Sequence, residues 1–226
     1  MDQTWKLSPS DLTFLWDECP RCFYLKIVQG FNRPQTAFPK IFGRIDKLMK
    51  GFYENKPTGE VAPELPDGVV MLGEKWVTSQ PIQLPGHRAA CFIKGKFDSL
   101  VSFADHSYGI IDFKTSETRS EHVAFYSRQL HAYAYALENP APNCLSLSPV
   151  SRLGLLCVEP VGMQGMPPDQ VAYVGKKSWL EIPLDYAQFL GFLEQILGVL
   201  DKPEPPDSNP KCVWCNYRQE ARDRGV

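Results

Sequence analysis

Two aspartates and a lysine near the middle of this chain have the types and spacing to hold a divalent metal ion. Asp98 follows Gly95 in a Gly-x-x-Asp pattern, and Asp112 and Lys114 come fourteen and sixteen residues after Asp98. Residues two apart in a strand point to the same face, so Asp112 and Lys114 share a face while Phe113 points toward the core. If the two segments are neighbouring strands joined by a short turn, the two carboxylates converge at one end of a sheet.

This arrangement suits the hydrolysis of a phosphodiester bond. Two carboxylates hold Mg²⁺ or Mn²⁺ through oxygen ligands, and the metal acidifies water and neutralises charge at the phosphate. A nearby lysine positions the attacking water and adds positive charge. The alternative for Asp112 and Lys114 is an exposed ion pair at a strand end, worth about 0–1 kcal/mol. The Asp-x-Lys triplet alone favours that alternative, since Glu54-Asn55-Lys56 has the same form.

Four of the seven cysteines form two C-x-x-C pairs. Cys19 and Cys22 lie in the N-terminal part, and the Pro-rich stretch 203–210 precedes Cys212 and Cys215. Four thiolates complete a structural zinc site or hold an iron–sulfur cluster. Two unrelated pairs of reduced thiols are the alternative. The other three cysteines stand in apolar surroundings and are expected to be buried small hydrophobes; they are Cys91, Cys144 and Cys157.

The apolar periodicity predicts the elements that position these residues. Helices are expected from a start at Ser8 or Ser10, and over 42–53, 121–138 and 186–200. Extended segments are expected over 69–77, 89–93, 97–103, 108–113, 152–158 and 171–182, with a turn at 105–107. This order predicts a single α/β or α+β domain over residues 1–226, in which a helical segment 1–56 and a C-terminal segment 203–226 meet at the cysteines.

The helix expected over 121–138 carries Gln129 and Tyr133 on one face. By themselves these residues would be an ordinary helix surface. Taken in order, Gly-x-x-Asp at 95–98, Asp-x-Lys at 112–114 and Gln-x-x-x-Tyr at 129–133 resemble the motifs of RecB-type nucleases of the PD-(D/E)XK superfamily. That group includes the CRISPR-associated RecB-family exonucleases. The resemblance implies an α/β fold with a restriction-endonuclease-like core, a mixed central sheet flanked by helices, and it implies that Gln129 and Tyr133 contact DNA near the scissile phosphate.

For the acidic site, the resemblance implies that Asp98, Asp112 and the backbone carbonyl of Phe113 bind Mg²⁺ or Mn²⁺, and that Lys114 is the catalytic lysine. Such nucleases often carry a metal-binding histidine on an upstream helix, after a glycine. Here Asp46 stands in a similar place and is a weaker candidate ligand, with a solvated helix residue as the alternative.

For the cysteines, the resemblance implies a 4Fe-4S cluster, which related exonucleases often bind through one N-terminal and three C-terminal cysteines. Here the last C-terminal cysteine is absent, and Cys22 supplies the fourth thiol. The expected ligands are therefore Cys19, Cys22, Cys212 and Cys215. Zinc is the alternative metal, because paired C-x-x-C motifs also form tetrahedral zinc sites.

Composition sets limits on the function. The net charge of −2 and the pI near 6.1 give no support to a protein that coats nucleic acid nonspecifically, but they are compatible with an enzyme that has a local basic groove. Neither a secretory signal nor an apolar run of about 18 residues is visible, so a cytoplasmic protein with no membrane partner is expected.

Three functions follow from these patterns. The first is a metal-dependent deoxyribonuclease, specifically an exonuclease on single-stranded DNA. The second is a non-catalytic iron–sulfur or zinc DNA-binding scaffold subunit with protein partners in a DNA-processing complex. The third is a redox or structural metal protein in which only the cysteines matter. The joint presence of Asp98, Asp112 and Lys114 favours the first, and DNA repair, phage biology and CRISPR adaptation are all compatible pathways.

Overall fold

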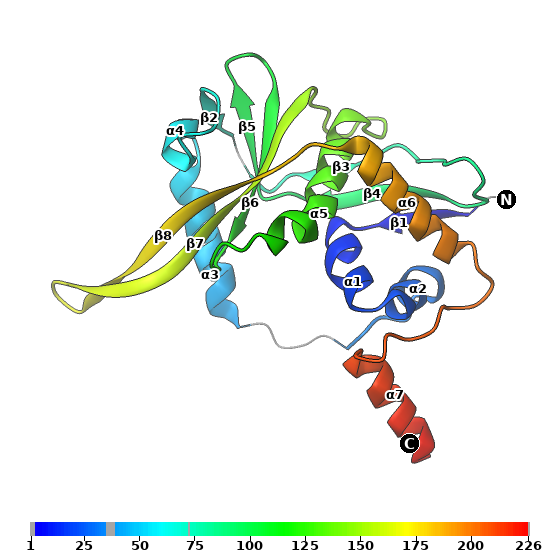
Figure 1. The fold of residues 1–226 in the computed structure, drawn as a ribbon. Coiled ribbons are helices and arrows are strands. Elements are labelled where there is room, and N and C mark those ends of the chain that lie inside the picture. The colour runs from blue at the N-terminus through cyan, green and yellow to red at the C-terminus, as the bar shows by residue number, and fades with distance from the viewer. Residues whose placement is uncertain (1–2, 35–38, 72, 226) are drawn as a thin grey trace.

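The computed structural model describes residues 3–34, 39–71 and 73–225 (Figure 1). The N-terminal elements are strand β1 (Thr4–Leu7), a π-helical segment η1 (Asp11–Leu15) and helices α1 (Trp16–Glu18) and α2 (Pro20–Gln29). Proline suits the first turn of α2, where its missing N–H needs no partner. Gly30 ends the helix at φ +66°, and its N–H donates to the carbonyl of Leu25. The predicted helical start near Ser8 is confirmed, because helical structure begins at Pro9. The short strand β1 before it was not expected.

Two sheets form the centre of the fold. The smaller has the order β1-β4-β3, in which β4 (Ala90–Lys96) pairs in parallel with β1 and antiparallel with β3 (Trp76–Thr78). The larger has the order β2-β5-β6-β7-β8, with bounds Gly68–Val70, Ser99–Phe103, Tyr108–Lys114, Val150–Met166 and Gln170–Ile182. It is a mixed sheet, because β6 and β7 are parallel while its other neighbours are antiparallel.

The remaining helices are α3 (Lys40–Tyr53), α4 (Thr58–Val61), α5 (Glu121–Glu138), α6 (Tyr186–Leu200) and α7 (Val213–Asp223). Helix α5 crosses over between the parallel strands β6 and β7 and packs with α6 on one face of the larger sheet. His131 joins these two helices, since its Nε2 accepts the backbone N–H of Asp185 at 2.8 Å. Helix α3 covers the opposite face, over a core that includes Met49, Phe113 and Leu156. The expected mixed sheet flanked by helices is confirmed.

The expected element ranges differ from the structure in three places. The stretch 69–77 is divided between β2 and β3, which belong to different sheets. The stretch 97–103 becomes a strand only from Ser99, because the chain crosses between the sheets before it. Strand β7 continues well past the predicted 152–158, and with β8, whose predicted range was nearly right, it forms a long hairpin that projects from the body (Figure 1). The single domain and its segment boundaries stay predictions.

No helix within the described residues is long and apolar enough to cross a membrane.

Candidate active site

Asp98 and Asp112 lie together where the chain passes from the small sheet to the large one. Asp98 falls between the end of β4 and the start of β5, rather than on a strand as expected. The antiparallel pairing of Ser99 with Ile111 brings Asp98 level with Asp112 on β6. The backbone N–H of Phe113 donates to Asp98 Oδ2 at 3.2 Å. The two carboxylates therefore converge through strand register.

Lys114 forms an ion pair with Asp112 inside the protein. Asp112 is only 3% exposed, and Lys114 Nζ also lies over the Tyr126 ring, 4.3 Å from its centroid. Burial raises the pKa of Asp112 to about 7; the positive charge of Lys114 opposes this shift and the Asp98 carboxylate adds to it. Burial also disfavours the Lys114 ammonium, but its pairing with Asp112 raises the pKa of Lys114. An exposed strand-end ion pair is therefore the wrong description of these two residues.

A second lysine, Lys50 on α3, lies among three carboxylates beside this pair. Its Nζ is 2.7 Å from Asp46 Oδ2, 2.8 Å from Asp98 Oδ1 and 3.1 Å from Glu74 Oε1. The Lys50 side chain is 14% exposed. Burial disfavours its charge, yet the surrounding carboxylates raise the pKa of Lys50. Asp46 thus lies beside the acidic centre, with an ammonium group between its carboxylate and that of Asp98.

Glu74 reaches this cluster through a constrained backbone. Its φ of +59° lies in the left-handed region, and its N–H donates to the Asp98 carbonyl at 3.0 Å. A Cβ added to the preceding Gly73 would lie 2.1 Å from that carbonyl oxygen, so the close approach requires glycine. Neither Lys50 nor Glu74 was expected as a site residue. The spacing of Lys50 four residues after Asp46 is a usable sequence signal for an ion pair, but no local pattern marks Glu74.

Gln129 and Tyr133 point from α5 into the protein. They are 6% and 5% exposed, so the alternative of an ordinary helix surface is wrong. Gln129 Nε2 donates to Asp112 Oδ1 at 3.3 Å, and Tyr133 OH donates to the Lys96 carbonyl at 2.8 Å. Tyr133 also meets the ring of Phe97 edge to face. The two motif residues therefore hold the acidic centre in place, Gln129 at Asp112 and Tyr133 at the end of β4.

The four cysteines of the two C-x-x-C pairs form one cluster. Their sulfur atoms all lie within 4.8 Å of one another, and three of the separations are 3.6, 3.8 and 3.8 Å. Arg33 donates to Cys212 Sγ at 3.4 Å, and Arg218 donates to Cys22 Sγ at 3.0 Å. Two guanidinium groups thus offset the negative charge that four thiolates would carry. Two unrelated thiol pairs are excluded.

The other three cysteines play no part in this cluster. Cys91 and Cys157 are buried, as expected, whereas the same expectation was wrong for Cys144, which is half-buried.

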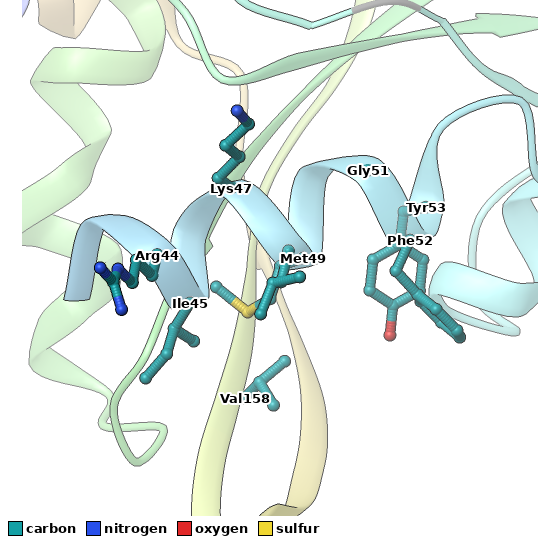
Figure 2. A pocket seen from close by; sticks show the side chains of 9 residues that line it. Arg44, Ile45, Lys47, Met49, Gly51, Phe52, Tyr53 and Val158 are labelled. Carbon is teal, nitrogen blue, oxygen red and sulfur yellow. The ribbon is translucent and has the colours of Figure 1, made fainter. Parts of the chain in front are cut away.

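An apolar pocket of about 830 Å³ lies on another side of α3 (Figure 2). Figure 2 shows Ile45 and Met49 facing Val158 on β7, with Phe52 and Tyr53 further along the helix. No carboxylate or cysteine is among the described residues that line it. The apolar stripe expected over 42–53 is therefore only partly buried. The charged residues of α3 that belong to the acidic centre, Asp46 and Lys50, are on a different side of the helix from this pocket.

A family model described as the PD-(D/E)XK nuclease superfamily matches residues 60–219, well over half of the 226-residue chain. The chain belongs to the PD-(D/E)XK nuclease superfamily. Among solved structures, one named "Crystal structure of SSO0001" is similar at 18% sequence identity with a TM-score of 0.49, and the similarity covers 95% of this chain and 84% of that chain. No curated protein matches.

PD-(D/E)XK nucleases usually use divalent metal ions, and the residues at the acidic centre fit such an ion. The carboxylates of Asp98 and Asp112 converge, and hard oxygen donors are what Mg²⁺ and Mn²⁺ prefer. The carbonyl oxygen of the buried Gln129 side chain has no hydrogen-bond partner among the described residues. A buried acceptor without a donor is costly, and a cation or its water would satisfy it.

Proposed function

We propose that this chain is a metal-dependent deoxyribonuclease that hydrolyses DNA phosphodiester bonds at the centre formed by Asp98, Asp112 and Lys114. The observation that carries the proposal is the buried pairing of Asp112 with Lys114 directly beside Asp98. Lys114 and Lys50 offset part of the charge of Asp112 and Asp98, but burial and the repulsion between the two carboxylates still raise the pKa of Asp112. A divalent cation is the partner that makes such a site favourable.

Asp98, Asp112 and the Phe113 carbonyl would hold Mg²⁺ or Mn²⁺. When bound, the ion supplies Lewis acidity that activates water and neutralises charge on the phosphate. Lys114 is held over Tyr126 within reach of the same position, where its ammonium stabilises negative charge that develops during hydrolysis. Asp46 remains a weaker candidate ligand, because Lys50 lies between it and Asp98.

Gln129 and Tyr133 are proposed to act at the substrate side of this centre. Gln129 positions Asp112 through its amide N–H, and its buried carbonyl oxygen has no hydrogen-bond partner among the described residues. Tyr133 fixes the end of β4 and also lines an open groove next to the centre. Tyr133 can therefore contact a DNA strand that enters the groove, whereas Gln129, only 6% exposed, acts on the substrate through Asp112 and the site around it.

The sulfur separations favour zinc in the cysteine cluster over the 4Fe-4S cluster that the resemblance implies. Zinc binds thiolates at about 2.3 Å, and the edge of that tetrahedron is about 3.8 Å. Three of the six separations, 3.6 to 3.8 Å, are close to this edge, and all six lie within 4.8 Å. A four-iron cluster places iron and sulfide between the thiolates and needs them further apart. A colourless protein with one zinc per chain would support this choice, while a brown protein with broad visible absorption would overturn it.

The finer assignment is a RecB-type exonuclease acting on single-stranded DNA. Its test uses end-labelled single-stranded and duplex DNA with Mn²⁺, with Mg²⁺ and with EDTA. We expect metal-dependent cleavage that falls by about a hundredfold or more in Asp112→Asn, because a metal site supplies several kcal/mol of transition-state stabilisation. Asp169→Asn is the matched control, since Asp169 lies at the exposed hairpin tip with φ +64°, where asparagine is tolerated.

The alternative is a non-catalytic DNA-binding scaffold in a DNA-processing complex. It gains if the wild type binds DNA and retains its cysteine-bound metal but cuts no substrate with any metal tested. Cleavage that persists in EDTA would contradict the metal-dependent mechanism itself.

A further inference from the structure

We propose that the exposed face of the three-stranded sheet β1-β4-β3 is a binding platform for a single strand of nucleic acid that leads into the acidic centre. This inference rests on the proposed nuclease function, and it names the surface and the strand state of the substrate. It is carried by strand register, charge and the position of one tryptophan.

The register places one face of this sheet in the core and the other in solvent. Leu7, Val77 and Ile93 point inward and are fully buried. The alternate residues point outward, where Trp76 is paired with Lys96. Lys94 is the partner of Thr78, and Lys6 is on the same side of β1. Lys6, Lys94 and Lys96 are exposed, and Trp76 is 62% exposed.

These residues line a groove of about 900 Å³. No aspartate or glutamate is among the described residues that line it. Lys96 does form an ion pair with Glu74 outside the lining, with 2.5 Å between Nζ and Oε2. The described lining thus carries three lysines, although the net charge of the chain is −2. The local charge therefore suits a phosphate backbone.

The groove ends at residues that adjoin the acidic centre. Tyr133 lines it, and the same side chain donates to the carbonyl of Lys96. Lys96 precedes Asp98 by two residues, and Glu74 bridges Lys96 to Lys50. We infer that a strand lying along the lysines extends toward Asp98 past Glu74, whose charge is offset by Lys96 and Lys50.

Trp76 indicates a single strand rather than a duplex. Its indole is on a sheet surface with nothing over most of it, and an unpaired base can stack on such a ring. In a duplex the base faces are already stacked on one another, so only the phosphates would meet the lysines. An acidic peptide would also satisfy the lysines, but it would not use the indole in this way.

The test measures binding apart from cleavage. Fluorescence anisotropy is recorded with a labelled 15-nucleotide oligothymidylate and the corresponding duplex, in EDTA, with wild type, Trp76→Ala and Lys94→Met. We expect Trp76→Ala to weaken single-strand binding by about tenfold and to leave the weaker duplex binding nearly unchanged. Lys94→Met should reduce the slope of log K against log salt by about 0.7.

Tyr173→Ala and Lys176→Met are the matched controls, since both residues are exposed on the β8 side of the projecting hairpin. Single-strand binding that is equal in wild type and Trp76→Ala would overturn the platform, even if the protein cuts DNA. Loss of binding in Tyr173→Ala to the same degree would also overturn it. If Trp76→Ala loses binding while wild type cuts no DNA with any metal, the platform stands and the nuclease proposal fails.

Discussion

Replacing Lys50 by methionine should convert a position now held by an ammonium group into one that attracts a metal ion. Lys50 Nζ lies within 3.1 Å of oxygens from Asp46, Asp98 and Glu74. Hard oxygen donors in this number are also what a divalent cation requires. Methionine keeps most of the length of the side chain and its apolar stem, and removes the charge.

The expected effect can be estimated from the charges. Two unit charges 4 Å apart interact by about 4 kcal/mol at an effective dielectric constant of 20. The carboxylates are between 22% and 48% exposed, so solvent screening reduces this to a fraction. A conservative gain of about 1.4 kcal/mol makes Mn²⁺ binding tenfold tighter. At saturating Mn²⁺ the same energy adds about 3–6 °C to the metal-induced rise in Tm for a chain of this size.

The assay is isothermal titration with Mn²⁺, together with thermal unfolding in EDTA and in excess Mn²⁺. In EDTA, Lys50→Met should unfold at a lower temperature than wild type, because three carboxylates have lost their shared cation. Lys47→Met is the control, since Lys47 is exposed on the same helix and should leave both measurements unchanged. Equal or weaker Mn²⁺ affinity in Lys50→Met would refute the view that the ammonium competes with the metal.

Three further outcomes are expected. Because burial raises the pKa of Asp112 to about 7, protons compete with Mn²⁺ for its carboxylate below that pH. The affinity for Mn²⁺ should rise about tenfold per pH unit up to pH 7 and then level off. An affinity that does not change with pH would contradict the assignment of Asp112 as a metal ligand. Cys22→Ser should release the cysteine-bound metal and lower Tm, and an unchanged metal content measured by elemental analysis would exclude Cys22 as a ligand. Tyr133→Phe loses the hydrogen bond to the Lys96 carbonyl, so unfolding should cost about 1 kcal/mol less, and an unchanged denaturation midpoint would argue against this contact.

Local sequence patterns determined much of this protein. The helices 121–138 and 186–200 have the predicted bounds, because each has an apolar face with helical spacing over many residues. The turn between β5 and β6 and the alternation around Asp112 were also predictable, since they depend on neighbours along the chain. The pairing of the two C-x-x-C motifs followed from cysteine chemistry, and the sulfur atoms do cluster.

Tertiary structure alone decided the contents of the acidic centre. Lys50 and Glu74 come from a helix and a loop that approach Asp98 only after folding, and no motif links them to it. The burial of Gln129 and Tyr133 depends on which elements α5 packs against, and the helical spacing of residues does not predict those partners. The pairing of β1 with β4 joins residues more than 80 positions apart, and it creates the lysine-lined face. Periodicity reports which side of an element is apolar, whereas the partner of that side is fixed by long-range packing.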